Sequence, residues 1–276
     1  MLLVECFLMT KLTRLLSFAF ALLFTPVYLQ ITDAKESLDA FRRRAHALRD
    51  EDKTAEALKV LDEAIRLYPF DCHPYGERGD IYLQTGEYKK SVEAYTQCLK
   101  VQPNFADMEK QRAFAYLGLG DNKSAIADFS SSLRHNPDRR AFIGFRADAY
   151  EKDGQLEKAI ADRTRMIQLE PTDTGAYLAR AMLFKKLGQN DKAIADLSKA
   201  ISIAPDSEYL AYTRRADIYC LRREFGKAVE DYTHALAADP LEPGIIYSGR
   251  AQAYEKLGKH ELAAKDRTAA REAGFK

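Results

Sequence analysis

The chain has 276 residues, 46% of them hydrophobic and 30% charged, which is the balance of an ordinary folded protein and excludes a disordered one. Its 42 basic and 41 acidic residues leave a net charge of +1, so the sequence lacks the strongly basic character of a nucleic-acid-binding protein. The cysteines show neither a CxxC pair nor a histidine at metal-binding spacing, and we predict no metal site, cofactor or disulfide framework. They are Cys6, Cys72, Cys98 and Cys220.

The first 34 residues differ from the rest of the chain. Lys11 and Arg14 precede an apolar stretch of about 15 residues, from Leu15 to Leu29. A basic region, a short apolar region and a small residue such as Ala34 at the cleavage position are typical of a secretory signal peptide. We therefore expect residues 1–34 to direct export, to the periplasm or out of the cell.

A membrane anchor is the alternative for the same segment. The apolar stretch is short for a membrane span, which needs about 20 residues, but Val27 to Ile31 can extend it. Residues 15–31 would then tether the chain to a membrane. A third alternative is that the segment does neither, and translation from Met9 instead of Met1 also stays open.

A dipeptide, Arg-Ala or Arg-Gly, recurs through the rest of the chain, with four steps of 34 residues followed by two of 35. A proline keeps the same period. A fixed period of this length indicates stacked supersecondary units instead of a single globular core. The arginines are Arg44, Arg78, Arg112, Arg146, Arg180, Arg215 and Arg250, and the prolines are Pro69, Pro103, Pro137, Pro171, Pro205 and Pro240.

Residues 174–207 illustrate one unit. Apolar residues lie three or four apart in two segments, which defines one face of a helix in each segment. Gly188 interrupts the chain between the segments, and Pro205 ends the second one. Each unit is therefore predicted to be a pair of antiparallel helices. The apolar positions are Tyr177, Ala181, Phe184, Ala193, Leu197 and Ala200.

This pattern resembles the tetratricopeptide repeat (TPR) family. In the family's frame, the matching residues are an aromatic or apolar residue at position 4, Gly or Ala at 8, Tyr at 11, Gly at 15, Ala at 20, an aromatic at 24, Ala at 27 and Pro at 32. The resemblance implies an all-α fold, a right-handed α-solenoid of antiparallel helix pairs, as a TPR domain over residues 35–276. The repeats are 38–71, 72–105, 106–139, 140–173, 174–207, 209–242 and 244–276.

The sequence departs from the family pattern at a few positions. Asp52 and Arg223 stand at the turn where glycine is usual, and Arg163 and Arg267 stand at the aromatic position 24. The recurring arginine is itself unusual, because position 7 is commonly apolar in the family.

An aspartate at position 23 accompanies that arginine in five repeats. Position 7 lies on the first helix of a pair and position 23 on the second, both toward the packed face. We predict five ion pairs that fix the register of the two helices, and an anion-binding arginine row is the alternative. The predicted pairs are Arg112–Asp128, Arg146–Asp162, Arg180–Asp196, Arg215–Asp231 and Arg250–Asp266.

The resemblance also implies where a partner binds, because TPR arrays hold peptides in a concave groove lined by positions 2, 5, 9, 12 and 13 of the first helices. Apolar residues and carboxylates share these positions here. Such a surface suits an extended or helical peptide with apolar anchors and some positive charge. The alternative is that this face is simply exposed to solvent, with apolar residues scattered over it. The candidate groove residues are Asp80, Lys110, Phe114, Leu117, Asp148, Leu178, Met182, Leu210 and Asp217.

The chaperone-binding members of the family hold a carboxylate with a Lys and an Asn on the first helix, an Asn on the next, and a Lys/Arg pair on the third. The corresponding positions here hold other residues, so binding of chaperone tails by that clamp is disfavoured. They are Arg42 and His46, then Glu77, then Asp107 and Gln111.

We find no pattern of catalytic residues. The five histidines occupy different repeat positions, and no Ser/His/Asp order or phosphate-binding loop is present. The sequence therefore predicts a non-enzymatic scaffold or adaptor that binds a protein or peptide in the groove. The alternative is a self-associating structural component of an envelope assembly.

Overall fold

The computed structural model describes residues 36–205 and 209–275, and within them the chain forms fourteen helices and no strands. Residues 1–34, which the sequence predicts to be a signal peptide or anchor, lie outside the described residues. The first helices of the pairs, the A helices, are α2 (Leu38–Asp50), α4 (His73–Gln84), α6 (Ala106–Gly118), α8 (Arg140–Lys152), α10 (Thr174–Lys186), α12 (Tyr209–Leu221) and α14 (Pro243–Lys256). The second helices, the B helices, are α3 (Thr54–Leu67), α5 (Tyr88–Val101), α7 (Asn122–His135), α9 (Leu156–Leu169), α11 (Asn190–Ile203), α13 (Phe225–Ala237) and α15 (His260–Glu272).

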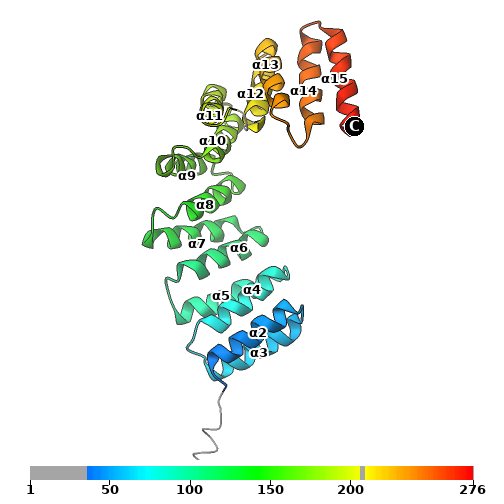
Figure 1. Cartoon of the computed structure of the whole chain (residues 1–276). Coiled ribbons are helices and arrows are strands. Elements are labelled where there is room, and N and C mark those ends of the chain that lie inside the picture. Colours follow the sequence, from blue (N-terminus) through cyan, green and yellow to red (C-terminus); the bar gives the residue numbers. More distant parts are fainter. Residues whose placement is uncertain (1–35, 206–208, 276) are drawn as a thin grey trace, which may run out of the picture.

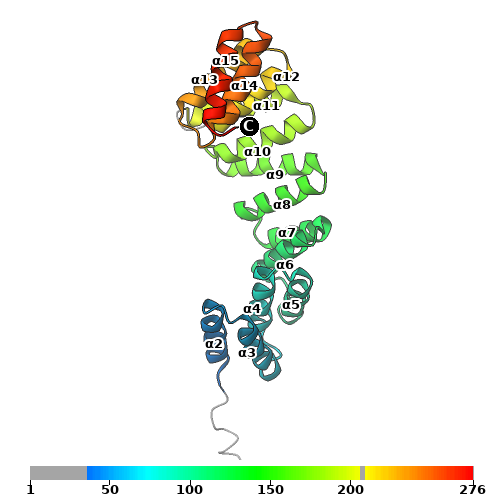
Figure 2. The ribbon, with the colours of Figure 1, turned by 90° about the vertical axis from the view of Figure 1, so that its right-hand side faces the viewer.

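The helix pairs stack one after another into an elongated, curved array. Each A helix packs against its own B helix, and each B helix packs against the next A helix. Figures 1 and 2 show α2 and α15 at opposite ends of this array. The predicted all-α solenoid of helix pairs is confirmed. Among residues 36–205 and 209–275, no helix is both long and apolar enough to cross a membrane.

The turn between the helices of each pair has one geometry throughout. In the second pair, Gly86 has φ +75°, its N–H donates to the Leu83 carbonyl, and the N–H of Glu87 donates to the Tyr82 carbonyl. These two bonds define the Schellman motif, which needs a left-handed residue and therefore favours glycine. Asp52 and Arg223, which depart from glycine, adopt the same conformation with φ of 59° and 61°.

Replacement of Arg223 by glycine should therefore stabilise the protein. The left-handed conformation costs a residue with a Cβ about 1–2 kcal/mol, and Arg223 is exposed, with no packing to lose. We expect Arg223→Gly to raise the free energy of unfolding by about 1 kcal/mol in urea denaturation. As the matched control, Gly188→Ala should lower it by a similar amount, because φ there is +70° and nothing crowds the added Cβ. Destabilisation by Arg223→Gly would contradict this account.

Small and large residues alternate where the helices of a pair meet. A Cβ added at Gly79 on α4 would lie only 2.6 Å from the ring of Tyr95 on α5, which is fully buried. The same device serves between pairs, where a Cβ added at Gly249 on α14 would lie 2.7 Å from the Tyr232 ring on α13 of the preceding pair. Small residues on the A helices thus make room for large ones on the B helices, and the core runs between successive helices along the array.

Candidate functional site

The structure brings together the members of all five predicted Arg–Asp pairs. In each pair the guanidinium donates from Nε and Nη2 to the two carboxylate oxygens, at 2.7–2.8 Å. The aspartates are buried, and the arginine side chains are mostly buried, with 16–22% of their surface exposed. Such two-pronged, charge-assisted bonds fix both distance and orientation, so each pair sets the register of its A and B helices.

The same guanidinium groups also reach the preceding helix pair, a contact absent from the sequence-based prediction. Their Nη1 atoms donate to a Ser or Thr hydroxyl at position 25 of the preceding repeat. Each arginine therefore joins three helices. The bonds run from Arg112 to Thr96 (3.0 Å), Arg146 to Ser130 (3.3 Å), Arg180 to Thr164 (2.9 Å), Arg215 to Ser198 (2.7 Å) and Arg250 to Thr233 (3.0 Å).

Arg78 shows what happens where the aspartate is missing. Ala94 occupies position 23 in its repeat, and Arg78 instead donates to Asp62 at 2.8 Å and to Gln97 at 2.7 Å. Its buried Nε, the atom that meets an aspartate in the later repeats, has no hydrogen-bond partner among the described residues. An unsatisfied buried donor is destabilising.

Ala94→Asp should supply the missing acceptor. We expect it to raise the free energy of unfolding by about 1 kcal/mol, since a hydrogen bond to a charged group contributes about 1.5–3 kcal/mol and burial of the carboxylate opposes it. Urea denaturation of the variant tests this. Ala94→Asn, which is similar in size but uncharged, serves as the control and should gain less. A loss of stability in Ala94→Asp would show that Arg78 is already satisfied.

The predicted groove aspartates lie on the A helices, and each is bound by the residue at position 24 of its own B helix. The hydroxyl of Tyr95 donates to Asp80 at 2.5 Å and that of Tyr232 donates to Asp217 at 2.7 Å. Arg163, one of the departures at position 24, donates to Asp148. Burial raises the pKa of Asp80, and the bonds from Tyr95 and from Gln111 partly offset this. These carboxylates therefore already have partners within the chain.

Positions 9 and 24 are matched chemically in the other central repeats as well. Where position 9 is apolar, as at Phe114 and Met182, position 24 is Phe129 or Leu197, both fully buried. The Phe114 ring meets Phe129 edge-on, with centroids 5.7 Å apart. The B helix thus determines how much of each position 9 side chain is available to a partner.

The remaining groove candidates lie in different surroundings along the array. Lys110 lies with its Nζ 5.7 Å from the Phe142 ring centre, and Leu117 and Leu178 pack partly buried against neighbouring core residues. Met182 is partly buried on α10. The nine candidates therefore follow successive A helices and do not converge on one pocket. We call the surface formed by positions 2, 5, 9, 12 and 13 of the A helices the A-helix face.

Leu210 belongs to an apolar hollow between α12 and α14. The hollow has a volume of about 330 Å³ and exposes several large apolar side chains. Leu241 is 90% exposed and Ile245 50% exposed, and because they line one hollow with Leu210 they form an apolar patch of the kind that marks an interaction site. The hollow is lined by Tyr209, Leu210, Thr213, Leu241, Glu242, Ile245 and Ile246.

Arg214, at position 6 of its repeat, lies four residues after Leu210 on α12, so its side chain borders the A-helix face on the same side of the helix. Its Nε is buried, and the Arg214 side chain makes no hydrogen bond or ion pair among the described residues. The arginines of the five Arg–Asp pairs, Arg78 and Arg163 are all paired, whereas the exposed Arg223 is open to water. The sequence does not reveal this difference, because it depends on which groups the neighbouring helices present.

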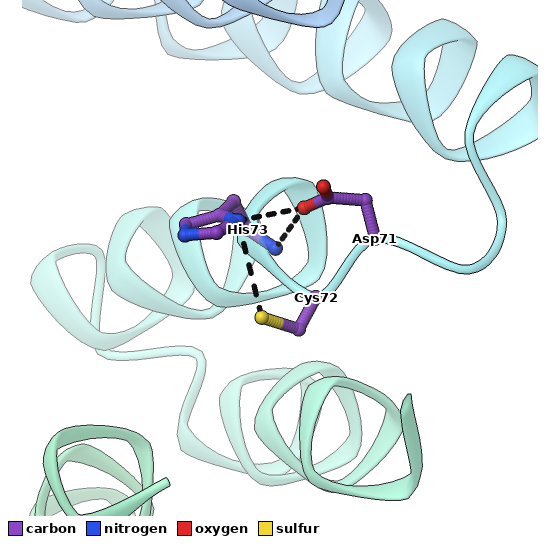
Figure 3. Close-up of side chains that lie close together, drawn as sticks. All are labelled: Asp71, Cys72 and His73. Atoms are coloured by element: carbon purple, nitrogen blue, oxygen red, sulfur yellow. Dashed lines mark hydrogen bonds and ion pairs between the residues drawn. The ribbon is translucent and has the colours of Figure 1, made fainter. Parts of the chain in front are cut away.

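A separate group of side chains carries donor atoms suited to a metal ion. Asp71, Cys72 and His73 lie in the connection between α3 and α4 and at the start of α4, with their donor atoms within 4.8 Å of one another (Figure 3). Burial raises the pKa of the Cys72 thiol. These residues lie apart from the five ion pairs, which connect A and B helices farther along the chain.

Family comparison agrees with the helix-pair architecture. One model of the tetratricopeptide repeat matches residues 73–105 and 174–207, and a second tetratricopeptide repeat model matches residues 111–174. The chain belongs to the tetratricopeptide repeat proteins. Proteins of this family generally act as interaction scaffolds and not as enzymes.

Solved structures share the fold at low sequence identity. The C-terminal part of a TPR protein from Cytophaga hutchinsonii is 16% identical, with a TM-score of 0.66, and the match covers 84% of this chain and 92% of that one. A tetratricopeptide repeat protein from Parabacteroides merdae ATCC 43184 is 21% identical, with a TM-score of 0.61 and coverage of 86% and 93%. YrrB, described as a TPR protein with an unusual peptide-binding site, is 20% identical, with a TM-score of 0.56 and coverage of 67% and 94%. None of the curated proteins matches the sequence.

Proposed function

We propose that this protein is a non-enzymatic scaffold that binds a protein partner through an extended or helical segment laid along the A-helix face. The observation that carries the proposal is the apolar hollow beside Arg214. Leu210, Leu241 and Ile245 expose apolar area that a partner's side chain would cover. The likeness to YrrB concerns the fold and adds a precedent for peptide binding by such an array.

The charges on the A-helix face and at its border favour an acidic partner segment. The sequence suggested a partner with positive charge, but Asp80, Asp148 and Asp217 are each bound by a donor from their own B helix. Arg214 has no counter-charge among the described residues. A carboxylate of the partner would satisfy it, while an apolar side chain one helical turn away enters the hollow. Glu242, which also lines the hollow, would repel a second acidic residue of the partner placed in the hollow itself.

Matched peptides test this partner chemistry. Fluorescent peptides with a central Leu-Ile pair flanked by Glu should bind at least about tenfold tighter than those in which Lys replaces each Glu, because one charge-assisted hydrogen bond contributes about 1.5–3 kcal/mol. Arg214→Ala should remove this preference, Ile245→Ser should weaken both peptide series, and Glu242→Gln should strengthen binding of the acidic series.

Arg222→Ala is the control for the loss of one positive charge. Arg222 is paired with Asp191 and Glu224 in the turn beyond α12. This variant should keep the preference for the acidic peptides. Equal binding of both peptide series, or an unchanged preference in Arg214→Ala, would contradict the proposed partner chemistry. Concentration-dependent oligomers in light scattering would instead favour the self-associating structural component.

We also propose that the protein is exported or tethered to a membrane by its N-terminal segment. The support is the basic and apolar pattern of residues 1–34 alone. Cell fractionation followed by N-terminal sequencing tests this proposal. A chain that begins near residue 35 supports a cleaved signal peptide, an intact chain in the membrane fraction supports an anchor through residues 15–31, and an intact chain in the cytoplasm rules out both.

A further inference from the structure

Asp71, Cys72 and His73 bring a carboxylate, a thiol and an imidazole together at the start of α4. The Nδ1 atom of His73 lies 2.7 Å from Asp71 Oδ1 and 3.9 Å from Cys72 Sγ. Figure 3 shows the three side chains converging, although they are consecutive in the sequence. The usual separations of ligands in metal-binding motifs do not include such a group, so the sequence predicted no metal site here.

The fold holds these side chains close together without a metal. Asp71 Oδ1 accepts the backbone N–H of His73 at 2.9 Å, which fixes the carboxylate at the helix start. Cys72 is buried, and its Sγ lies 3.0 Å from Gln102 Oε1 at the end of α5. His73 is half-exposed, so one side of the group stays open to solvent. The Asp71 carboxylate and the Cys72 thiol are therefore held in place by the protein, while the His73 imidazole stays accessible to solvent.

We propose that Asp71, Cys72 and His73 bind a zinc ion. Thiolate sulfur, imidazole nitrogen and carboxylate oxygen are the donors that zinc takes in proteins, usually four in a tetrahedron. Donor atoms about 2.0–2.3 Å from a tetrahedral zinc lie about 3.3–3.7 Å from one another. The present separations, from 2.7 Å to at most 4.8 Å, need changes of no more than about 1.5 Å to reach this geometry. Water takes the fourth position on the solvent side.

The site ties down the connection between the first two helix pairs. Arg78, on the same α4, lacks the position 23 aspartate that fixes the later pairs, since Ala94 stands there. The missing contact is between α4 and α5, whereas a zinc ion held by the loop and the first turn of α4 would restrain how the second pair begins. Because metal binding to the folded state alone stabilises that state, zinc should raise the melting temperature of the chain.

Cobalt(II) and zinc binding to the reduced full-length chain test the proposal. Cobalt should give a thiolate-to-metal charge-transfer band, and zinc competition with a chromogenic chelator should give one tight site per chain. Cys72→Ser should abolish the band, and His73→Ala should weaken zinc binding by more than about tenfold. His73 is half-exposed at the helix start, so this variant should fold, as circular dichroism can verify.

Two further variants separate a metal site from ordinary helix capping. Asp71→Asn keeps an acceptor oxygen for the His73 N–H but removes the charge, so it should preserve the fold and weaken zinc binding. Cys220→Ser removes a thiol on α12, far along the chain, and should leave the cobalt band unchanged. No tight zinc binding, or a cobalt band that survives Cys72→Ser, would overturn the proposal. Because the peptide-binding residues lie on α12 and α14, failure of the zinc site leaves the proposed scaffold function unaffected.

Discussion

Arg112→Ala should lower the free energy of unfolding by about 3 kcal/mol at neutral pH. The variant leaves the Asp128 carboxylate, which is buried, without the two bonds that now satisfy it at 2.7 and 2.8 Å. Removal of one partner from a buried ion pair typically costs about 3–5 kcal/mol, and we expect the lower end because the guanidinium keeps some contact with solvent. Urea denaturation followed by circular dichroism measures the change.

The penalty should shrink as the pH falls. Burial raises the pKa of Asp128 above its ordinary value of 3.8, and the hydrogen bond and charge of Arg112 oppose this rise. Without Arg112 the folded-state pKa rises further, so the folded variant takes up a proton at a pH where the unfolded chain is still ionised. A raised acid pKa destabilises the folded state above that pKa, and the effect disappears as the pH falls toward 3.8.

Arg43→Ala is the matched control, since Arg43 is exposed on α2. This variant should change the free energy of unfolding by less than about 0.5 kcal/mol, both at neutral pH and at acidic pH. A loss below that limit in Arg112→Ala, or a loss that grows on acidification, would show that the Arg–Asp pairs do not stabilise the array.

Phe129→Ala should have an equally large effect, about 3–5 kcal/mol. Phe129 is fully buried on α7, with its ring centre 5.7 Å from that of Phe114 and 5.9 Å from that of Phe145. These neighbours come from α6 and α8, so the truncation opens a cavity between two helix pairs that a rigid array closes only in part. Thermal and urea denaturation both report the loss.

Two comparisons define the origin of this loss. Phe129→Leu keeps most of the volume and should lose less than about 1.5 kcal/mol. Leu119→Ala removes a half-exposed apolar residue from the turn after α6 and should lose less than Phe129→Ala does. Equal losses in Phe129→Ala and Leu119→Ala would contradict the placement of the core between helix pairs.

The repeat made the fold and the Arg–Asp pairs predictable. Seven copies of one pattern indicate which positions face each other, so Arg180 and Asp196 could be paired from their positions in the repeat alone. The hydroxyls at position 25, such as Thr164, recur with the same period and could have been found in the same way. The prediction missed these hydroxyls because it considered contacts within one repeat, whereas their bonds cross from one repeat to the next.

The A-helix face was less predictable, because the state of a side chain there depends on its neighbours. Asp217 is a candidate for a free carboxylate in the sequence, yet Tyr232, which also fills the core, donates to it. Arg214 has the opposite character, since nothing in the sequence distinguishes an arginine without a partner from a paired one. The position of a residue in the repeat was therefore informative, whereas its partner had to come from three-dimensional packing.

Photo-cross-linking of a bound peptide tests the proposed binding face most directly. An acidic peptide with a benzophenone in place of its apolar anchor should label α12 and the start of α14, around Leu210 and Ile245, and Arg214→Ala should reduce the labelling. Labelling confined to the B helices, such as α11 and α13, or labelling that Arg214→Ala leaves unchanged, would contradict partner binding along the A-helix face.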